Sequence, residues 1–137
     1  DGELLGQTQA LAKTLGLSDS VDFLGSQSNV YPYLQNSDLF LLPSLYEGMP
    51  MTLIEAMGTG LPIVASKVGG VPDMLADGKS AILTDCTPEK VAQAACRILE
   101  DEALRKTLGQ AAKAGSETFS AAHMAESYVR VYRAEGA

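Results

Sequence analysis

Several residue types on which catalytic and metal sites depend are scarce in this sequence. Its 137 residues include no tryptophan, one histidine and two cysteines. Cys86 and Cys96 lack the repeated short spacing of a zinc site and are too few for a disulfide framework, so we expect buried free thiols. With His123 alone, neither a histidine metal cluster nor a histidine-paired nucleophile is available. The sequence therefore predicts no metal site.

Positive charge and long apolar runs are also scarce. Ten basic and seventeen acidic residues give a net charge of −7, which argues against a nucleic-acid partner. No apolar run approaches the roughly 18 residues of a membrane-spanning helix. Hydrophobic residues make up 46% of the sequence and charged residues 20%, which is typical of a globular domain. One compact domain over residues 1–137 is the resulting prediction.

Short apolar runs alternate with amphipathic stretches, a pattern typical of an α/β domain with a parallel sheet. The pattern predicts four strands, at residues 21–25, 39–43, 61–66 and 81–84. The continuous apolar run of the second strand predicts burial on both of its faces. The pattern also predicts four helices in this part, at residues 4–15, 30–34, 51–58 and, after a glycine turn, 71–78.

The last third of the sequence is predicted to be wholly helical. Apolar residues recur there at helical spacing in three groups, around Ile98, Leu108 and Tyr128. The domain is therefore predicted to have an α/β part, residues 1–87, followed by a helical tail, residues 88–137.

The beginning of the sequence lacks an element that such a sheet requires. Asp1 leads directly into a helical pattern, although the other helices of the α/β part follow strands. A doubly wound sheet grows outward from its first strand. We therefore expect an N-terminally truncated domain, which folds poorly or borrows contacts from another chain when it is isolated.

The candidate site lies where a predicted strand ends at Pro43 and a glycine-containing loop leads to a helix that begins near Pro50. In parallel α/β sheets, ligands bind beyond the carboxyl ends of the strands. The first-turn N–H groups of a helix are unpaired and favour negative charge. Because proline has no N–H, the amides of Met51, Thr52 and Leu53 are predicted to donate to a diphosphate.

Two carboxylates flank this helix start. Glu47 lies in the loop, where it can face a group above the helix end. Glu55 lies about a turn and a half into the helix, and its side chain leans back toward the N-terminus, where it can accept hydrogen bonds from vicinal hydroxyls. Gly48 lets the backbone approach a ligand without a Cβ in the way. Taken alone, the two glutamates are more typical of a solvated loop acid and a solvated helix acid than of a site.

The segment from Val21 to Asp85 resembles the C-terminal domain of a large family of retaining glycosyltransferases, the group 1 or family 4 type. That family includes sucrose synthases, mannosyltransferases and many bacterial lipopolysaccharide and capsule enzymes. Its hallmark is a glutamate, seven residues and a second glutamate, which Glu47 and Glu55 match. The neighbouring blocks match as well: Val21-Asp22-Phe23-Leu24-Gly25, Ser37-Asp38-Leu39-Phe40-Leu41-Leu42-Pro43-Ser44, Gly60-Leu61-Pro62-Ile63-Val64-Ala65 and Val68-Gly69-Gly70-Val71-Pro72.

This resemblance implies the C-terminal half of a GT-B fold: a Rossmann-like parallel sheet with flanking helices and a helical C-terminal tail. It implies a nucleotide-diphosphate sugar, such as a UDP- or GDP-sugar, as the substrate, with no metal or other cofactor. Glu47 would be the catalytic residue at the donor sugar, and Glu55 would hold the nucleotide ribose. The implied donor-binding residues are Ser44, Glu47, Gly48, Met49, Pro50, Met51, Thr52, Leu53 and Glu55.

The resemblance also implies parts that this sequence does not contain. The family neutralises the leaving diphosphate with an arginine and a lysine after the first strand of the domain, and its acceptor binds to an N-terminal domain. We therefore expect the 137 residues to be inactive alone, with that N-terminal domain as their partner. We expect a cytoplasmic location, with any peripheral attachment to the inner membrane face made only through the missing part.

Two alternative functions and one question about a turn stay open at this point. Some nucleotide-sugar epimerases share the GT-B fold, and a non-catalytic nucleotide-sugar-binding domain would also lack the arginine and lysine. Separately, the turn at Gly69-Gly70 either borders the site or serves the backbone conformation alone.

Overall fold

The computed structural model describes residues 2–134 and divides into two compact units, residues 1–30 and 31–137. The first unit contains the predicted opening helix, α1 (Leu5–Thr14). Gly16, with a φ of 69°, ends this helix in the left-handed conformation. This conformation lets the amide of Leu17 donate to the carbonyl of Ala12, at 2.8 Å.

The strand predicted at residues 21–25 is absent from the described structure. The segment has no regular secondary structure, and Val21, Phe23 and Leu24 are 38%, 37% and 51% exposed. A strand needs a neighbouring strand to pair its backbone groups, because the hydrogen bonds of the ladder offset the entropy lost by extending the chain. Residues 21–25 form no strand within the described part of their own unit, so this prediction is wrong.

The second unit is built on a parallel sheet whose three strands follow the order β1-β2-β3. Phe40 pairs with Ile63 between the first two strands, and Val64 pairs with Ile82 between the last two. These strands confirm three of the four that the apolar pattern predicts. Their bounds are β1 (Phe40–Leu42), β2 (Ile63–Ser66) and β3 (Ile82–Thr84).

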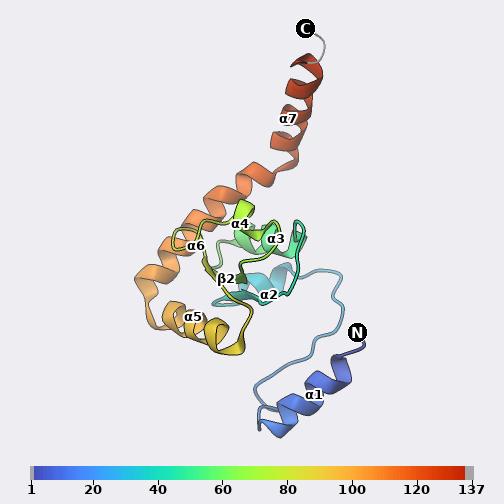
Figure 1. Ribbon diagram of the computed structural model, residues 1–137, viewed down its shortest axis with the longest axis vertical. Coiled ribbons are helices and arrows are strands. Elements are labelled where there is room, and N and C mark those ends of the chain that lie inside the picture. The colour runs from blue at the N-terminus through green and yellow to red at the C-terminus, as the bar shows by residue number, and fades with distance from the viewer. Residues whose placement is uncertain (1, 135–137) are drawn as a thin grey trace. The chain divides into compact units, whose positions relative to one another are not determined.

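Helices cover both faces of the central strand β2, whose four residues are all buried (Figure 1). On one face, Ile63 and Ala65 share a core with Leu53 and Val71 of the helices that follow the first two strands. On the other face, Val64 packs in a cluster with Ile98 and Leu108 of the helical tail. The helices of this unit before the tail are α2 (Tyr31–Gln35), α3 (Met51–Thr59) and α4 (Val71–Met74).

Strand β1 is less covered than its sequence predicts. Leu41 is 45% exposed, whereas its pairing partner Val64 on β2 is 1% exposed. The difference arises because β1 lies at the edge of the described sheet: Leu39, just before the strand, packs against the cluster around Val64, but Leu41 does not. The apolar run therefore predicted the strand correctly, but the prediction that both of its faces are buried is wrong.

The tail from Pro88 onward contains the three predicted helices, with a single 3₁₀ turn before the last. Within the described residues, no helix is long and apolar enough to cross a membrane. No residue of the last helix is buried. The bounds of these elements are α5 (Pro88–Glu100), α6 (Glu102–Ser116), η1 (Glu117–Phe119) and α7 (Ala121–Ala134).

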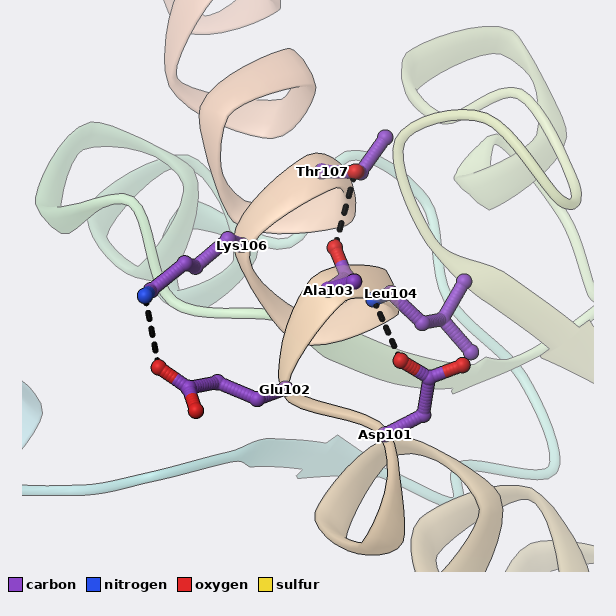
Figure 2. Close-up of polar contacts among 6 residues, drawn as sticks. All are labelled: Asp101, Glu102, Ala103, Leu104, Lys106 and Thr107. Atoms are coloured by element: carbon purple, nitrogen blue, oxygen red, sulfur yellow. Dashed lines mark hydrogen bonds and ion pairs between the residues drawn. The ribbon is translucent and has the colours of Figure 1, made fainter.

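The start of α6 is completed by side chains of the chain itself, as Figure 2 shows. Asp101 Oδ1 accepts a hydrogen bond from the amide of Leu104 at 2.9 Å, which is the usual N-cap arrangement. One residue further on, Glu102 forms an ion pair with Lys106 at 2.6 Å. The hydrogen bond and the charge of Lys106 hold the pKa of Glu102 below its usual value.

Candidate functional site

The candidate site lies at the carboxyl edge of the sheet, where the segments that follow the three parallel strands are tied together. The amide of Lys67, after β2, donates to the carbonyl of Thr84 at the end of β3, at 2.9 Å. The thiol of Cys86, after β3, donates to the carbonyl of Pro43 after β1, at 2.9 Å. These two hydrogen bonds link the chain segments at the carboxyl ends of the three strands to one another.

Both cysteines are free, as the sequence predicts, but neither is buried. Cys86 is half-buried and Cys96 is exposed on α5. The prediction of burial is wrong because Cys96 lies on the outer surface of its helix, away from the buried residues Ala94 and Ile98. The strand-end position of Cys86 places its thiol at the edge of the core.

The start of α3 is left open by the chain. Its N-cap is Pro50, with extended backbone angles, no side-chain cap and no acidic residue in the first turn. The amide of Leu53 donates to the carbonyl of Pro50 at 3.1 Å, so it already has an acceptor. Among residues 2–134, no acceptor is found for the amides of Met51 and Thr52. Two of the three predicted donors therefore remain free for an anion.

Side-chain burial fixes which way α3 faces. Leu53, Ala56 and Met57 are fully buried, whereas Met51 and Thr52 are exposed. Glu55 is exposed as well, and it follows Met51 and Thr52 at the four- and three-residue spacings that place side chains on one face of a helix. The second glutamate of the motif thus lies on the same exposed face of the helix as the side chains of Met51 and Thr52, the residues whose amides are free.

The carboxylate of Glu47 is held by the residue at the end of the preceding strand. The hydroxyl of Ser44 donates to Glu47 Oε1 at 2.6 Å, and both residues are half-buried. A short bond of this kind orients the carboxylate and uses one of its oxygens. The second oxygen, Oε2, has no hydrogen-bond partner in the described part of the chain, so it is available to a ligand hydroxyl.

The rest of this loop projects from the surface of the second unit. We refer to residues 44–49 as the donor loop. Leu45, Tyr46 and Met49 are 86%, 82% and 64% exposed, and Gly48 is also exposed. The backbone of the donor loop is therefore accessible to a ligand, as the predicted roles of Gly48 and Met49 require.

The turn at Gly69-Gly70, between β2 and α4, contacts the donor loop directly. The sequence left the role of this turn undecided. A Cβ added at Gly69 would overlap the carbonyl oxygen of Glu47, and one at Gly70 would overlap the carbonyl oxygen of Gly48. The amide of Gly70 also donates to the carbonyl of Glu47, at 3.4 Å. The glycine turn therefore borders the candidate site. Its signal in the sequence is a glycine pair directly after a buried strand.

These features define the class of the domain: a Rossmann-like α/β unit with an uncapped helix start after its first described strand and two carboxylates, Glu47 and Glu55, on either side of that start in the sequence. The described residues contain no group of three or more histidine, cysteine or acidic side chains arranged to hold a metal ion.

The chain belongs to the family described as Glycosyl transferases group 1, whose sequence profile matches residues 1–115. It is 36% identical over 124 residues to N-acetyl-alpha-D-glucosaminyl L-malate synthase from Bacillus anthracis, covering 89% of this chain and 32% of that protein. It is 33% identical over 137 residues to the lipopolysaccharide core biosynthesis glycosyltransferase LpsD from Rhizobium meliloti (strain 1021), covering 96% of this chain and 39% of LpsD. The chain thus spans about a third of the length of these curated relatives.

Solved glycosyltransferase structures have the same fold over nearly the whole chain. Sucrose-phosphate synthase from Thermosynechococcus elongatus matches with a TM-score of 0.81 at 28% identity, covering 94% of this chain and 34% of that one. HepE from Anabaena, in complex with UDP-glucose, matches with a TM-score of 0.85 at 25% identity, covering 97% and 38%. The chain therefore has the Rossmann-like fold of one half of a GT-B glycosyltransferase, as the resemblance implied.

Proposed function

We propose that this chain is the donor-binding part of a retaining glycosyltransferase of the family 4 type, which transfers a sugar from a UDP- or GDP-sugar to an acceptor. The observation that carries the proposal is the open start of α3, with free amides at Met51 and Thr52 beside two carboxylates. Membership of the glycosyltransferase family and the UDP-glucose bound to the structurally similar HepE support this choice of ligand.

Each part of the donor has a group of matching chemistry in the site. The diphosphate accepts hydrogen bonds from the amides of Met51 and Thr52, where the dipole of α3 also favours negative charge. A hydroxyl of the donor sugar donates to Glu47 Oε2, since Ser44 holds the other oxygen. The ribose hydroxyls donate to Glu55 on the exposed face of the helix.

The proposed reaction breaks the bond between the sugar C1 and the oxygen of the leaving diphosphate. The acceptor oxygen forms its bond to C1 on the same face, and its proton passes to the leaving diphosphate, which departs as the nucleoside diphosphate. The amides at the start of α3 stabilise the negative charge that develops on the leaving group. Glu47 positions the sugar and stabilises the positive charge that develops at its ring.

The acceptor site and further cations for the diphosphate are proposed to belong to a longer protein of which these residues form a part. This follows from the coverage, since the chain spans about a third of its relatives. We expect the 137 residues alone to bind the donor weakly and to transfer no sugar.

Calorimetry and turnover of the full-length protein test the proposal. In Glu55→Gln, we expect UDP or GDP to bind about tenfold more weakly, because a charged hydrogen-bond acceptor is lost. The preference for the nucleotide over its 2′,3′-dideoxy analogue should shrink as well. In Glu47→Gln, nucleotide binding should be nearly unchanged while transfer falls about 100-fold, because Glu47 contacts only the sugar.

The control is Glu100→Gln, which changes an exposed acid at the far end of α5. Unchanged turnover in the Glu47→Gln/Glu55→Gln double variant would contradict the proposal that these two glutamates bind the donor. Epimerisation of the donor without an acceptor would contradict transfer, and inversion at the product's anomeric carbon, seen by NMR, would contradict retention.

A further inference from the structure

The turn between β2 and α4 is built to receive another backbone segment. Gly69 has a φ of 50°, a conformation that other residues seldom adopt, and Gly70 has an ordinary φ of −81°. At both positions a side chain would overlap a carbonyl oxygen of the donor loop, that of Glu47 or that of Gly48. Close approach of two backbones is therefore the feature that these two glycines share.

The turn itself is held by backbone hydrogen bonds and by buried residues on either side of it. The amide of Val68 donates to the carbonyl of Ser66 at 2.9 Å, and the amide of Val71 donates to the carbonyl of Val68 at 3.1 Å. The side chain of Val71 is fully buried, and Ser66 is 1% exposed. A rigid turn in direct contact with the exposed donor loop limits the positions that the loop can take.

We infer that Gly69 and Gly70 are positioning residues for donor binding: by letting the donor loop rest directly on the β2–α4 turn, they set the place of Glu47 and of the backbone at Gly48. This inference rests on the proposed function. The loop is held at two points, because the hydroxyl of Ser44 orients the carboxylate of Glu47 and the amide of Gly70 holds its carbonyl.

Gly70→Ala is the sharpest variant, because its backbone angles suit alanine and only the overlap with the Gly48 carbonyl is added. We expect kcat/KM of the full-length protein with UDP-glucose or GDP-mannose to fall about 100-fold, as for a displacement of about 1 Å in a site. The matched control is Gly58→Ala on α3, where an added methyl group meets no atom within 4 Å. The control should change kcat/KM by less than about twofold.

A second pair of variants covers the case in which Gly70→Ala fails to fold. Gly69 and Gly78 both have a positive φ, of 50° and 70°. An added Cβ would overlap the carbonyl oxygen of Glu47 at Gly69, whereas at Gly78 it would meet no atom within 4 Å. Asparagine tolerates this conformation better than most residues. Gly69→Asn should therefore reduce kcat/KM strongly, whereas Gly78→Asn should not.

A double-mutant cycle with Glu47 separates positioning from general destabilisation. If Gly70 acts through Glu47, Gly70→Ala should cost much less in a Glu47→Gln background than in the wild type. A merely structural role would give the same loss in both backgrounds and lower the melting temperature in parallel.

Wild-type kcat/KM in both Gly70→Ala and Gly69→Asn would overturn the inference, as would equal losses of Gly70→Ala in the two backgrounds. If the wild-type protein binds neither UDP nor GDP, the proposed function falls and the positioning role falls with it. If the wild-type protein binds a nucleotide and the glycine variants match it, only the positioning role is lost.

Discussion

Helices α3 and α6 belong to the same unit, but their first turns are completed in different ways. At α6, Asp101 caps the amide of Leu104, and Glu102 adds negative charge to the first turn. At α3, Pro50 provides no side-chain acceptor, and the first turn contains no acid. The chain thus satisfies one helix start with its own side chains and leaves the other without a side-chain cap, where we propose that the diphosphate of the donor binds.

The largest effect is expected when α3 is given an aspartate N-cap like that of α6. In Pro50→Asp, the new carboxylate would lie where the diphosphate is proposed to bind. Repulsion of about 4 kcal/mol is expected between charges about 4 Å apart near a surface, which weakens UDP or GDP binding about 1000-fold. Calorimetry of the full-length protein measures this loss.

The control for that variant is Pro50→Asn, which offers a similar cap without the charge. It should weaken nucleotide binding far less than Pro50→Asp does. Equal binding by Pro50→Asp and Pro50→Asn would show that no anion lies at the start of α3.

The opposite end of α3 should respond in stability rather than in binding. A Cβ at Gly109 of α6 would overlap the carbonyl oxygen of Gly60, which caps the C-terminus of α3. Gly109→Ala should therefore lower the free energy of unfolding by about 1–3 kcal/mol, as overpacking does in a dense core. Denaturant titration measures this change, with Gly115→Ala as the control because its added methyl group makes an ordinary contact with Met57. No difference between the two variants would show that the contact between α6 and the end of α3 is loose.

Removing the internal cap of α6 should have a smaller effect. Asp101→Ala leaves the amide of Leu104 without its side-chain acceptor and should cost about 1 kcal/mol of stability. Hydrogen exchange at the first amides of α6 should accelerate, while nucleotide affinity stays unchanged. A loss of affinity in this variant would contradict the division of roles between the two helix starts.

The smallest effect is expected from the ion pair on the surface of α6. Lys106 lowers the pKa of Glu102 from its usual 4.5, so the pair stabilises the folded state at neutral pH. That contribution is lost as the pH falls below 4.5 through the lowered pKa, because the carboxylate becomes protonated. The melting temperatures of wild type and Glu102→Gln should therefore differ slightly at pH 7 in low salt and converge in acid. Glu126→Gln serves as the control, since its carboxylate lies 3.8 Å from Arg130. A difference that persists in acid would exclude the ion pair as its cause.

Periodicity alone predicted most of the elements of this fold. The strands at Phe40–Leu42, Ile63–Ser66 and Ile82–Thr84 and the helices between them follow from runs of apolar residues and their spacing. Prediction failed at residues 21–25, which have the composition of a strand but no ladder in the described structure. It also failed for the burial of Leu41, which depends on what packs over an edge strand.

Some features of the candidate site were likewise predicted from the sequence, and others came only from the structure. Its position after an apolar run of strand length and the helix start at Pro50 without a side-chain cap follow from the order of residues 39–55. The bond from Ser44 to Glu47 is local, yet its geometry came only from the structure. The contact of Gly69 and Gly70 with the donor loop joins segments that follow different strands, and the sequence left its role undecided.

The sequence by itself determined the α/β class and the helical tail, and it singled out the candidate site and its two carboxylates, because these depend on short-range periodicity, proline and glycine. Only the tertiary structure decided which predicted strand pairs, which face of β1 is covered and which loop supports Glu47. Those outcomes depend on which segments become neighbours, and the pairing of β1 with β2 brings together residues that lie far apart along the chain.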